Sequence, residues 1–144
     1  MTVSHEAIYR RIIEEGFNQG NLAVVDELVA PGAREHQRGA KDGVEGTKGT
    51  IKYLRSAFPD FKITIDEVAV IGDTVWARQK GGGTNLGSFA GHAPTGIKAF
   101  IDVIDVVRIE DGKIVEHWGV PDQVGMMLQL GHVTAPNPPA PVTA

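Results

Sequence analysis

A histidine and an aspartate occur on two strand-like stretches that follow each other in the sequence. Residues 98–109 and 113–119 alternate in polarity, and the Asp111-Gly112 dipeptide between them is a turn signature typical of a β-hairpin. The hairpin would place Asp105 and His117 on neighbouring strands. Because a carboxylate and an imidazole can move protons near neutral pH, this hairpin is the first candidate for an active site.

The register of the hairpin decides whether these two side chains meet. A turn that pairs Glu110 with Lys113 brings Asp105 opposite either Trp118 or His117, and a slip of one residue turns every side chain to the other face. In the register that places Asp105 beside His117, valines and isoleucines surround both groups. Burial raises the pKa of a carboxylate and a neighbouring imidazolium lowers it, so such a pair can be tuned toward neutrality. A purely structural His–Asp hydrogen bond is the alternative interpretation.

The other polar motifs favour neither metal nor nucleotide chemistry. The remaining histidines are His5, His36, His92 and His132, and no two histidines have the HxH or HxxxH spacing of a dedicated metal site. The glycines at 81–83 do not open a helix after a strand, as a phosphate-binding loop would. The absence of cysteine excludes disulfides, thiolate catalysis and sulfur-ligated metals. We therefore expect no metal and no cofactor.

The composition predicts one globular protein of the cytoplasm. The chain has 144 residues, of which 42% are hydrophobic and 22% charged, and a formal net charge of −4. It has no clustered basic face, so a nucleic-acid partner is not expected. It has no apolar stretch near the roughly 18 residues that span a bilayer, and its charged N-terminus does not resemble a signal peptide. Membrane association is therefore not expected either.

The apolar spacing changes from helical to strand-like half-way along the chain. A helix capped by Ser4 is expected to end near Gly20, a short second helix to stop before Pro31, and a third to run over residues 44–57. Strands are then expected at 61–71, 74–80, 98–109 and 113–119, with a short strand or turn at 33–38 and a short strand candidate at 86–89. Asp122 is placed to cap a final helix that ends before Gly131. Helices followed by antiparallel strands indicate an α+β fold, with one domain over 1–131 and a flexible Pro/Ala-rich tail over 132–144.

Three segments in order resemble a known family. They are AFPDFKITIDEVAVIGDTVWAR, GTNLGSFAGHAPTG and DVVRIEDGKIVEHWGVPDQVGMMLQLG. Together they are similar to the SnoaL-like polyketide cyclases of the nuclear transport factor 2-like superfamily, and the similarity extends from about Ile8 to Gly131. The resemblance implies a cone-shaped α+β barrel, with three N-terminal helices packed on a curved, mostly antiparallel sheet. It also implies a hydrophobic small-molecule substrate and a homodimer or homotetramer.

The resemblance also implies roles for particular residues. The characterised cyclases close a ring by an intramolecular aldol reaction without a cofactor, and an aspartate directly after a His-Trp pair acts as the base. His117 matches the family's histidine, and Asp105 falls near a second polar position of the pocket; these two are the expected catalytic residues. The chain departs from the family pattern at Gly119, which stands where the catalytic aspartate is usual. The expected substrate-binding residues are His36, Asn85, Trp118 and Asp122.

Three functions remain open at this point. The first is a cofactor-independent cyclase or isomerase that acts by acid–base chemistry on a hydrophobic, carbonyl-bearing molecule. The second is a hydroxylase or epoxide-hydrolase-like enzyme of the same fold. The third is a non-catalytic small-molecule-binding protein, an interpretation favoured by the glycine that replaces the usual base.

Overall fold

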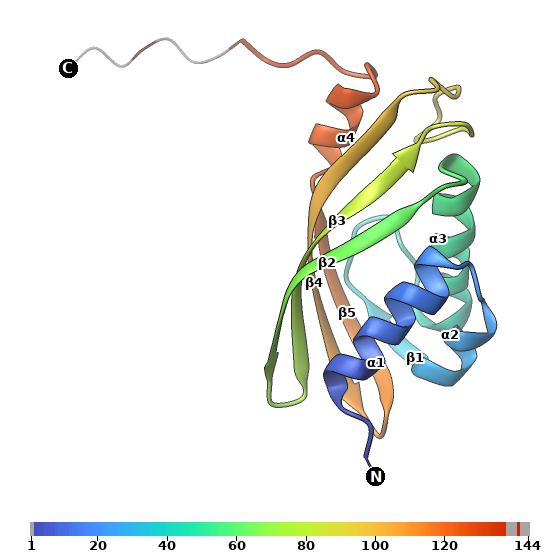
Figure 1. Cartoon of the computed structure of the whole chain (residues 1–144), viewed down its shortest axis with the longest axis vertical. Helices are drawn as coiled ribbons and strands as arrows, with labels where there is room; N and C mark the ends of the chain where they lie inside the picture. The colour runs from blue at the N-terminus through green and yellow to red at the C-terminus, as the bar shows by residue number, and fades with distance from the viewer. Residues whose placement is uncertain (1, 138–140, 142–144) are drawn as a thin grey trace.

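The computed structural model describes residues 2–137 and 141, and it confirms the α+β class. Of the expected tail at 132–144, residues 138–140 and 142–144 lie outside the described residues. Most of the helices precede most of the strands along the chain (Figure 1). In order, the elements are α1 (His5–Arg11), the π-helix η1 (Ile12–Asn18), α2 (Ala23–Leu28), β1 (Val29–Glu35), α3 (Gly43–Ala57), β2 (Lys62–Ile71), β3 (Thr74–Thr84), β4 (Lys98–Glu110), β5 (Lys113–Pro121) and α4 (Gln123–Gln129).

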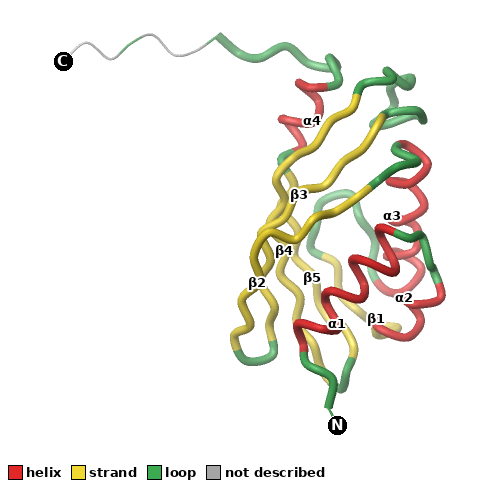
Figure 2. The backbone as a smooth tube through the Cα atoms, viewed as in Figure 1, coloured by secondary structure: helices red, strands yellow, loops and turns green. Residues whose placement is uncertain are grey.

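The five strands of the described chain form one curved sheet in the order β1-β5-β4-β3-β2. All neighbours pair antiparallel except β1, which runs parallel to β5. Figure 2 shows the strands curving round on one side of the molecule. The sheet is therefore curved and mostly antiparallel, as expected, but β1 and β2 remain its two edges and it does not close into a barrel.

Two of the shorter strand predictions need correction. β1 begins at Val29 rather than near residue 33, because the chain starts to pair with β5 as soon as α2 has ended. No strand forms over 86–89, where the only ladder contact is an isolated bridge between Phe89 and His92. Instead, β3 runs on through its three glycines to Thr84, opposite the first residues of β4.

The N-terminal helices cover one face of the sheet, and α4 lies at the far end of it from the N-terminus (Figure 1). The side chain of Ser4 accepts a hydrogen bond from the backbone N–H of Ala7 and so caps α1, as the sequence predicts. Asp122 caps α4 in the same way by accepting from the N–H of Gly125. The third helix also lies where it was expected.

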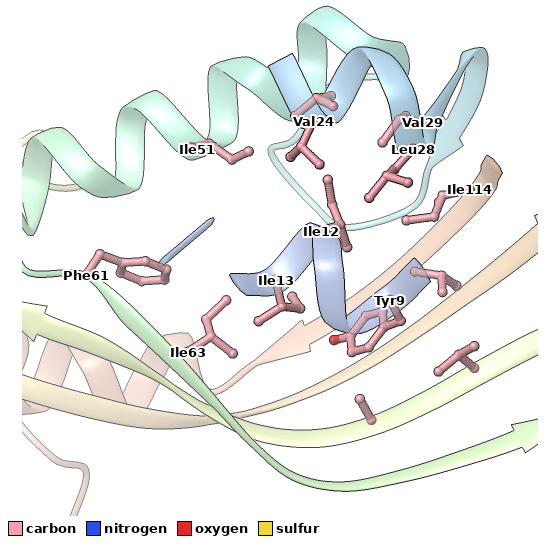
Figure 3. Close-up of a cluster of buried hydrophobic side chains, with 14 of the residues drawn as sticks. Tyr9, Ile12, Ile13, Val24, Leu28, Val29, Ile51, Phe61, Ile63 and Ile114 are labelled. Atoms are coloured by element: carbon pink, nitrogen blue, oxygen red, sulfur yellow. The ribbon is translucent and has the colours of Figure 1, made fainter. Parts of the chain in front are cut away.

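The core fills the space between these helices and the concave face of the sheet. Figure 3 shows Tyr9, Ile12 and Ile13 from the first helical segment facing Ile63 on β2 and Ile114 on β5. Tyr9 is only 1% exposed, so its hydroxyl group must find a partner inside the molecule. The other labelled core residues come from α2, the start of β1, α3 and the segment before β2: Val24, Leu28, Val29, Ile51 and Phe61.

The register of the β4–β5 hairpin differs from both registers considered for the sequence. Glu110 pairs with Lys113 as expected, but the register shifts by one residue beyond Ile109, leaving Val115 as a bulge. As a result, Asp105 pairs directly with Gly119. His117 lies diagonally from Asp105 on the same face, the face that lines the interior. The bulge therefore preserves the meeting of Asp105 and His117, although neither is directly opposite the other.

The glycines of β3 allow a close approach of backbones. A Cβ on Gly82 would overlap the carbonyl oxygen of Ala99 on β4 and lie 2.8 Å from Cα of Phe100. A Cβ on the neighbouring Gly81 would meet side-chain atoms of Ile63 at 3.4 Å, Phe61 at 3.7 Å and Val103 at 4.0 Å, all ordinary contact distances. Of these two positions, only Gly82 must be glycine to avoid a clash with the backbone of β4.

Within residues 2–137 and 141, no helix is both long enough and apolar enough to cross a membrane.

We expect Gly82→Ala to destabilise the protein, by about 1–3 kcal/mol, because the added carbon must push β3 away from β4. Gly49→Ala is the matched control: this glycine lies inside α3, has open space at its Cβ, and should gain about 0.5–1 kcal/mol from the better helix former. Urea unfolding of both variants measures the difference. Equal stability of Gly82→Ala and the wild type would contradict the close approach.

Candidate active site

His117 lies between two carboxylates. Its Nδ1 atom is 2.8 Å from both carboxylate oxygens of Glu35, and its Nε2 atom is 3.1 Å from Oδ1 of Asp105. Glu35 ends β1 and pairs in register with His117 on β5, so the parallel strand pairing brings this carboxylate to the ring. Both ring nitrogens can donate to carboxylates only when the imidazole is protonated.

The second oxygen of Asp105 is held by two further donors. The hydroxyl of Tyr9 donates to Oδ2 at 3.0 Å and the amide of Gln79 donates at 2.8 Å. The Tyr9 hydroxyl also lies 2.8 Å from Oε1 of Gln79. Tyr9 and Gln79 are each 1% exposed and Asp105 is 8% exposed. The carboxylate is thus buried, and side chains of the protein lie within hydrogen-bond distance of both its oxygens.

Strand alternation explains why these groups share one face. Gln79 pairs with Val103 and Ala77 pairs with Asp105, so Gln79 and Asp105 are diagonal neighbours on the inner face of β3 and β4. Tyr9 reaches them from α1, where it belongs to the buried stripe of that helix. We call the group Tyr9, Glu35, Gln79, Asp105 and His117 the polar cluster.

The cluster fixes the protonation of two of its members. Burial lowers the pKa of His117, but its hydrogen bonds to Asp105 and Glu35 and their negative charges outweigh this and raise the pKa to about 10. Burial, followed by the charge of Asp105, raises the pKa of Tyr9 above its ordinary value. At neutral pH the site therefore holds an imidazolium and a neutral phenol.

The polar cluster forms part of the wall of a cavity of about 560 Å³. Every member of the cluster lines this cavity. The rest of its wall is mainly apolar and comes from the helices and the sheet, including Ile12, Phe17, Leu54, Phe58, Phe61 and Ile101. Gly81 also lines it, where the missing side chain leaves space. A largely apolar cavity with a few convergent polar groups is typical of a small-molecule site.

The structure brings together the two expected catalytic residues but gives two of the other candidates different surroundings. His36 and Trp118 stack on each other, with ring centroids 4.8 Å apart and an interplanar angle of 4°, and neither lines the cavity. Nε2 of His36 is 2.6 Å from Oε2 of Glu116, which fixes the ring on the outer side of the strand pair. Strand alternation accounts for this, because Glu35 and His117 take the inner positions.

Asn85 and Asp122 have structural partners. The amide of Asn85 is buried, donates to the carbonyl oxygens of Ala57 and Gly87, and accepts from the N–H and hydroxyl of Thr95. Its bonding capacity is used in holding the loop after β3, and it does not line the cavity. Asp122 caps α4 and borders a smaller hollow beside the cavity.

Sequence reasoning missed three members of the polar cluster. Tyr9 belongs to an apolar helical stripe and gave no polar signal. Glu35 reaches His117 only because β1 pairs in parallel with β5, and no turn motif in the sequence indicates this pairing. Gln79 could have been found, because Trp76, Arg78 and Lys80 share the outer face of β3 and therefore leave Gln79 facing inward.

No group of three or more metal-ligating side chains in the described ranges is placed to hold a metal ion. Both nitrogens of His117 face carboxylates, an arrangement that suits proton chemistry.

Comparison with known proteins places the chain in a family. The model of the SnoaL-like polyketide cyclases matches residues 7–130. The chain belongs to the SnoaL-like polyketide cyclase family. It is 30% identical over 131 residues to the aklanonic acid methyl ester cyclase DauD of Streptomyces sp. (strain C5), covering 86% of this chain and 80% of the relative. DnrD of Streptomyces peucetius, an aklanonic acid methyl ester cyclase, is also 30% identical, with 86% and 88% covered.

A solved structure agrees with this assignment to the SnoaL-like family. IdmH from Streptomyces antibioticus superimposes with a TM-score of 0.80 at 33% identity, covering 90% of this chain and 99% of the other. The expected family is therefore confirmed, together with an α+β fold of helices packed on a curved, mostly antiparallel sheet, which stays open where a barrel was expected.

The raised pKa of His117 can be measured directly. In a histidine-labelled sample followed by NMR, we expect His117 to stay protonated through pH 8 and to titrate near pH 10. Glu35→Gln removes one of its two anionic partners and should lower that pKa. Glu6→Gln, which removes a carboxylate paired with Arg10 on the helix surface, is the control and should leave it unchanged. Titration of His117 near 6.5 in the wild type would contradict the geometry.

The same shift makes folding stability depend on pH. Below the unfolded pKa of about 6.5, both states bind the proton and the stabilisation from His117 is fully present. As the pH rises from 6.5 toward 10, only the folded state keeps the proton, so stability falls by up to about 1.4 kcal/mol per pH unit. Urea unfolding of the wild type and His117→Gln at pH 6, 8 and 10 should show their difference shrinking as the pH rises. A difference that stays constant over this range would argue against the shift.

Proposed function

We propose that this protein is a cofactor-independent cyclase that closes a ring in a hydrophobic, carbonyl-bearing molecule by acid–base chemistry. Asp105 acts as the base and His117 supplies positive charge beside it. One observation carries the proposal: the Asp105 carboxylate, next to the imidazole of His117, lines a mainly apolar cavity.

Asp105 can stand in for the aspartate that is usual at position 119. Asp105 and Gly119 are direct partners in the β4–β5 ladder. A Cβ on Gly119 would lie 3.0 Å from Oδ1 of Asp105 and 2.9 Å from Cε1 of His117. The carboxylate of Asp105 therefore reaches nearly the point from which a residue at 119 would act. The base is supplied by β4 instead of β5.

The reaction balances without any added reactant. Asp105 removes a proton from a carbon next to a carbonyl group, and the electron pair of that C–H bond forms an enolate. The enolate carbon attacks a second carbonyl carbon of the same molecule, and the C=O π pair moves to its oxygen. The proton returns to this alkoxide, so the product is an isomer of the substrate. The nearby imidazolium stabilises the negative charge that develops during these steps.

The substrate proposed for this site is a polyketide of the size that the cavity admits. A volume of about 560 Å³ lies within the range of drug-sized ligand sites. The two curated relatives are named for their action on aklanonic acid methyl ester. We take this ester as the first test compound for the present chain.

We expect the wild type to convert aklanonic acid methyl ester into an isomer of unchanged mass, and Asp105→Asn to lose about 10²–10⁴-fold in kcat. Asp102→Asn is the matched control, since Asp102 lies on the same strand but is exposed and paired with Lys80. Mass spectrometry in ¹⁸O-labelled water follows the product. Full activity in Asp105→Asn would exclude the proposed base. A product with an added ¹⁸O atom from water would point to an epoxide-hydrolase-like enzyme, and one with an added unlabelled oxygen from dioxygen would point to a hydroxylase. Binding without turnover would point to a ligand-binding protein.

A further inference from the structure

Gly119 is required by its surroundings and not by its backbone. It is not among the described glycines with a positive φ, so other residues could adopt its conformation. A Cβ at this position, however, would overlap Oε1 of Gln37. The same Cβ would lie 2.9 Å from Cε1 of His117 and 3.0 Å from Oδ1 of Asp105. The amide oxygen of Gln37 thus occupies the space that Gly119 leaves open beside both catalytic groups, and the NH2 group of the amide is bonded to the same carbon.

The backbone on either side of Gln37 is fixed. The N–H of His36 donates to the carbonyl oxygen of His117 at 2.9 Å, which extends the β1–β5 pairing beyond the end of β1. The N–H of Gln37 donates to Oε1 of Glu35 at 2.7 Å, and its carbonyl oxygen accepts from the N–H of Ala40 at 3.2 Å. Because His36 turns outward to stack on Trp118, alternation turns Gln37 inward.

The side chain of Gln37 keeps its hydrogen-bonding capacity for a ligand. Among the described residues, the side-chain amide of Gln37 has no hydrogen-bond partner, and only its backbone N–H donates to Glu35. The amide of Gln79, by contrast, bonds to Tyr9 and Asp105. Gln37 lines both the cavity and the smaller hollow that Gly119 and Asp122 border. It therefore stands where the two spaces meet, with two donors and one acceptor available.

We propose that the side-chain amide of Gln37 binds the oxygen of the reacting carbonyl group, and that Gly119 is needed because any larger residue would displace this amide. The inference rests on the proposed function and adds to it a residue that contacts the substrate. As the proton leaves the carbon, the carbonyl oxygen gains negative charge, and an N–H donor aimed at it binds more strongly. The amide thus contributes the donor while Asp105 contributes the base.

The test is a double-mutant cycle with Gln37→Ala, Gly119→Ala and the double variant, using aklanonic acid methyl ester as the probe. Dissociation constants from calorimetry and kcat are measured for each. We expect Gln37→Ala to lower kcat roughly 10- to 100-fold, since a hydrogen bond to a charge-bearing oxygen is lost. Gly119→Ala should lower it at least as far, because its methyl group also lies 2.9 Å from Cε1 of His117, and the loss in the double variant should be smaller than the two single losses combined. Gln19→Ala, an exposed glutamine away from the cavity, is the control and should be unchanged.

The outcomes separate this inference from the proposed function. A wild type that neither binds nor converts the ester contradicts the proposed function, and this inference with it. A wild type that is active while Gln37→Ala is equally active overturns only the role of Gln37. Fully additive losses in the double variant would mean that the new methyl group acts only on His117 or Asp105 and not through the amide of Gln37, which would also overturn it. The NMR titration of His117 in Gln37→Ala should follow the wild type, because the amide is expected to contact substrate and not to support the ring.

Discussion

A half-buried imidazolium held between two carboxylates is the interaction on which this structure depends. A charged group inside a protein is tolerated only when partners with good geometry replace its water. Here Glu35 and Asp105 flank His117, and Tyr9 and Gln79 complete the shell of Asp105. Each of these side chains comes from a different element, namely α1, β1, β3, β4 and β5. The site therefore exists only when the helix layer and four strands are assembled, and each of them is needed to keep a charge satisfied.

How far the sequence predicts the fold depends on how local each signal is. The Ser4 and Asp122 caps, the third helix and the Asp111-Gly112 hairpin follow from short patterns, and the structure confirms them. The hairpin register could not be derived, because the bulge at Val115 leaves no clear mark in an alternating strand. The position of β1 was missed for a different reason: parallel pairing joins segments about eighty residues apart without a connecting turn.

The candidate site shows the same division. Asp105 and His117 could be predicted together because they lie on one hairpin, but Glu35 and Tyr9 could not, since only tertiary packing brings them near. Asn85 was expected to bind substrate from the family resemblance alone. In the structure its amide bonds to the carbonyl oxygens of Ala57 and Gly87 and to Thr95. Most hydrogen bonds of side chains go to backbone groups or to water, so a buried polar side chain is by itself a weak sign of a ligand site.

Gly81 gives the cavity a property that the polar cluster does not have. This glycine lines the cavity wall, and a methyl group there would meet its neighbours only at ordinary van der Waals distances. One substitution could therefore narrow the chamber without moving a strand or touching a charged group. Substrate size and catalytic chemistry are in this sense separable traits, so descendants of such a chain can diverge in what they accept while inheriting the same reactive groups.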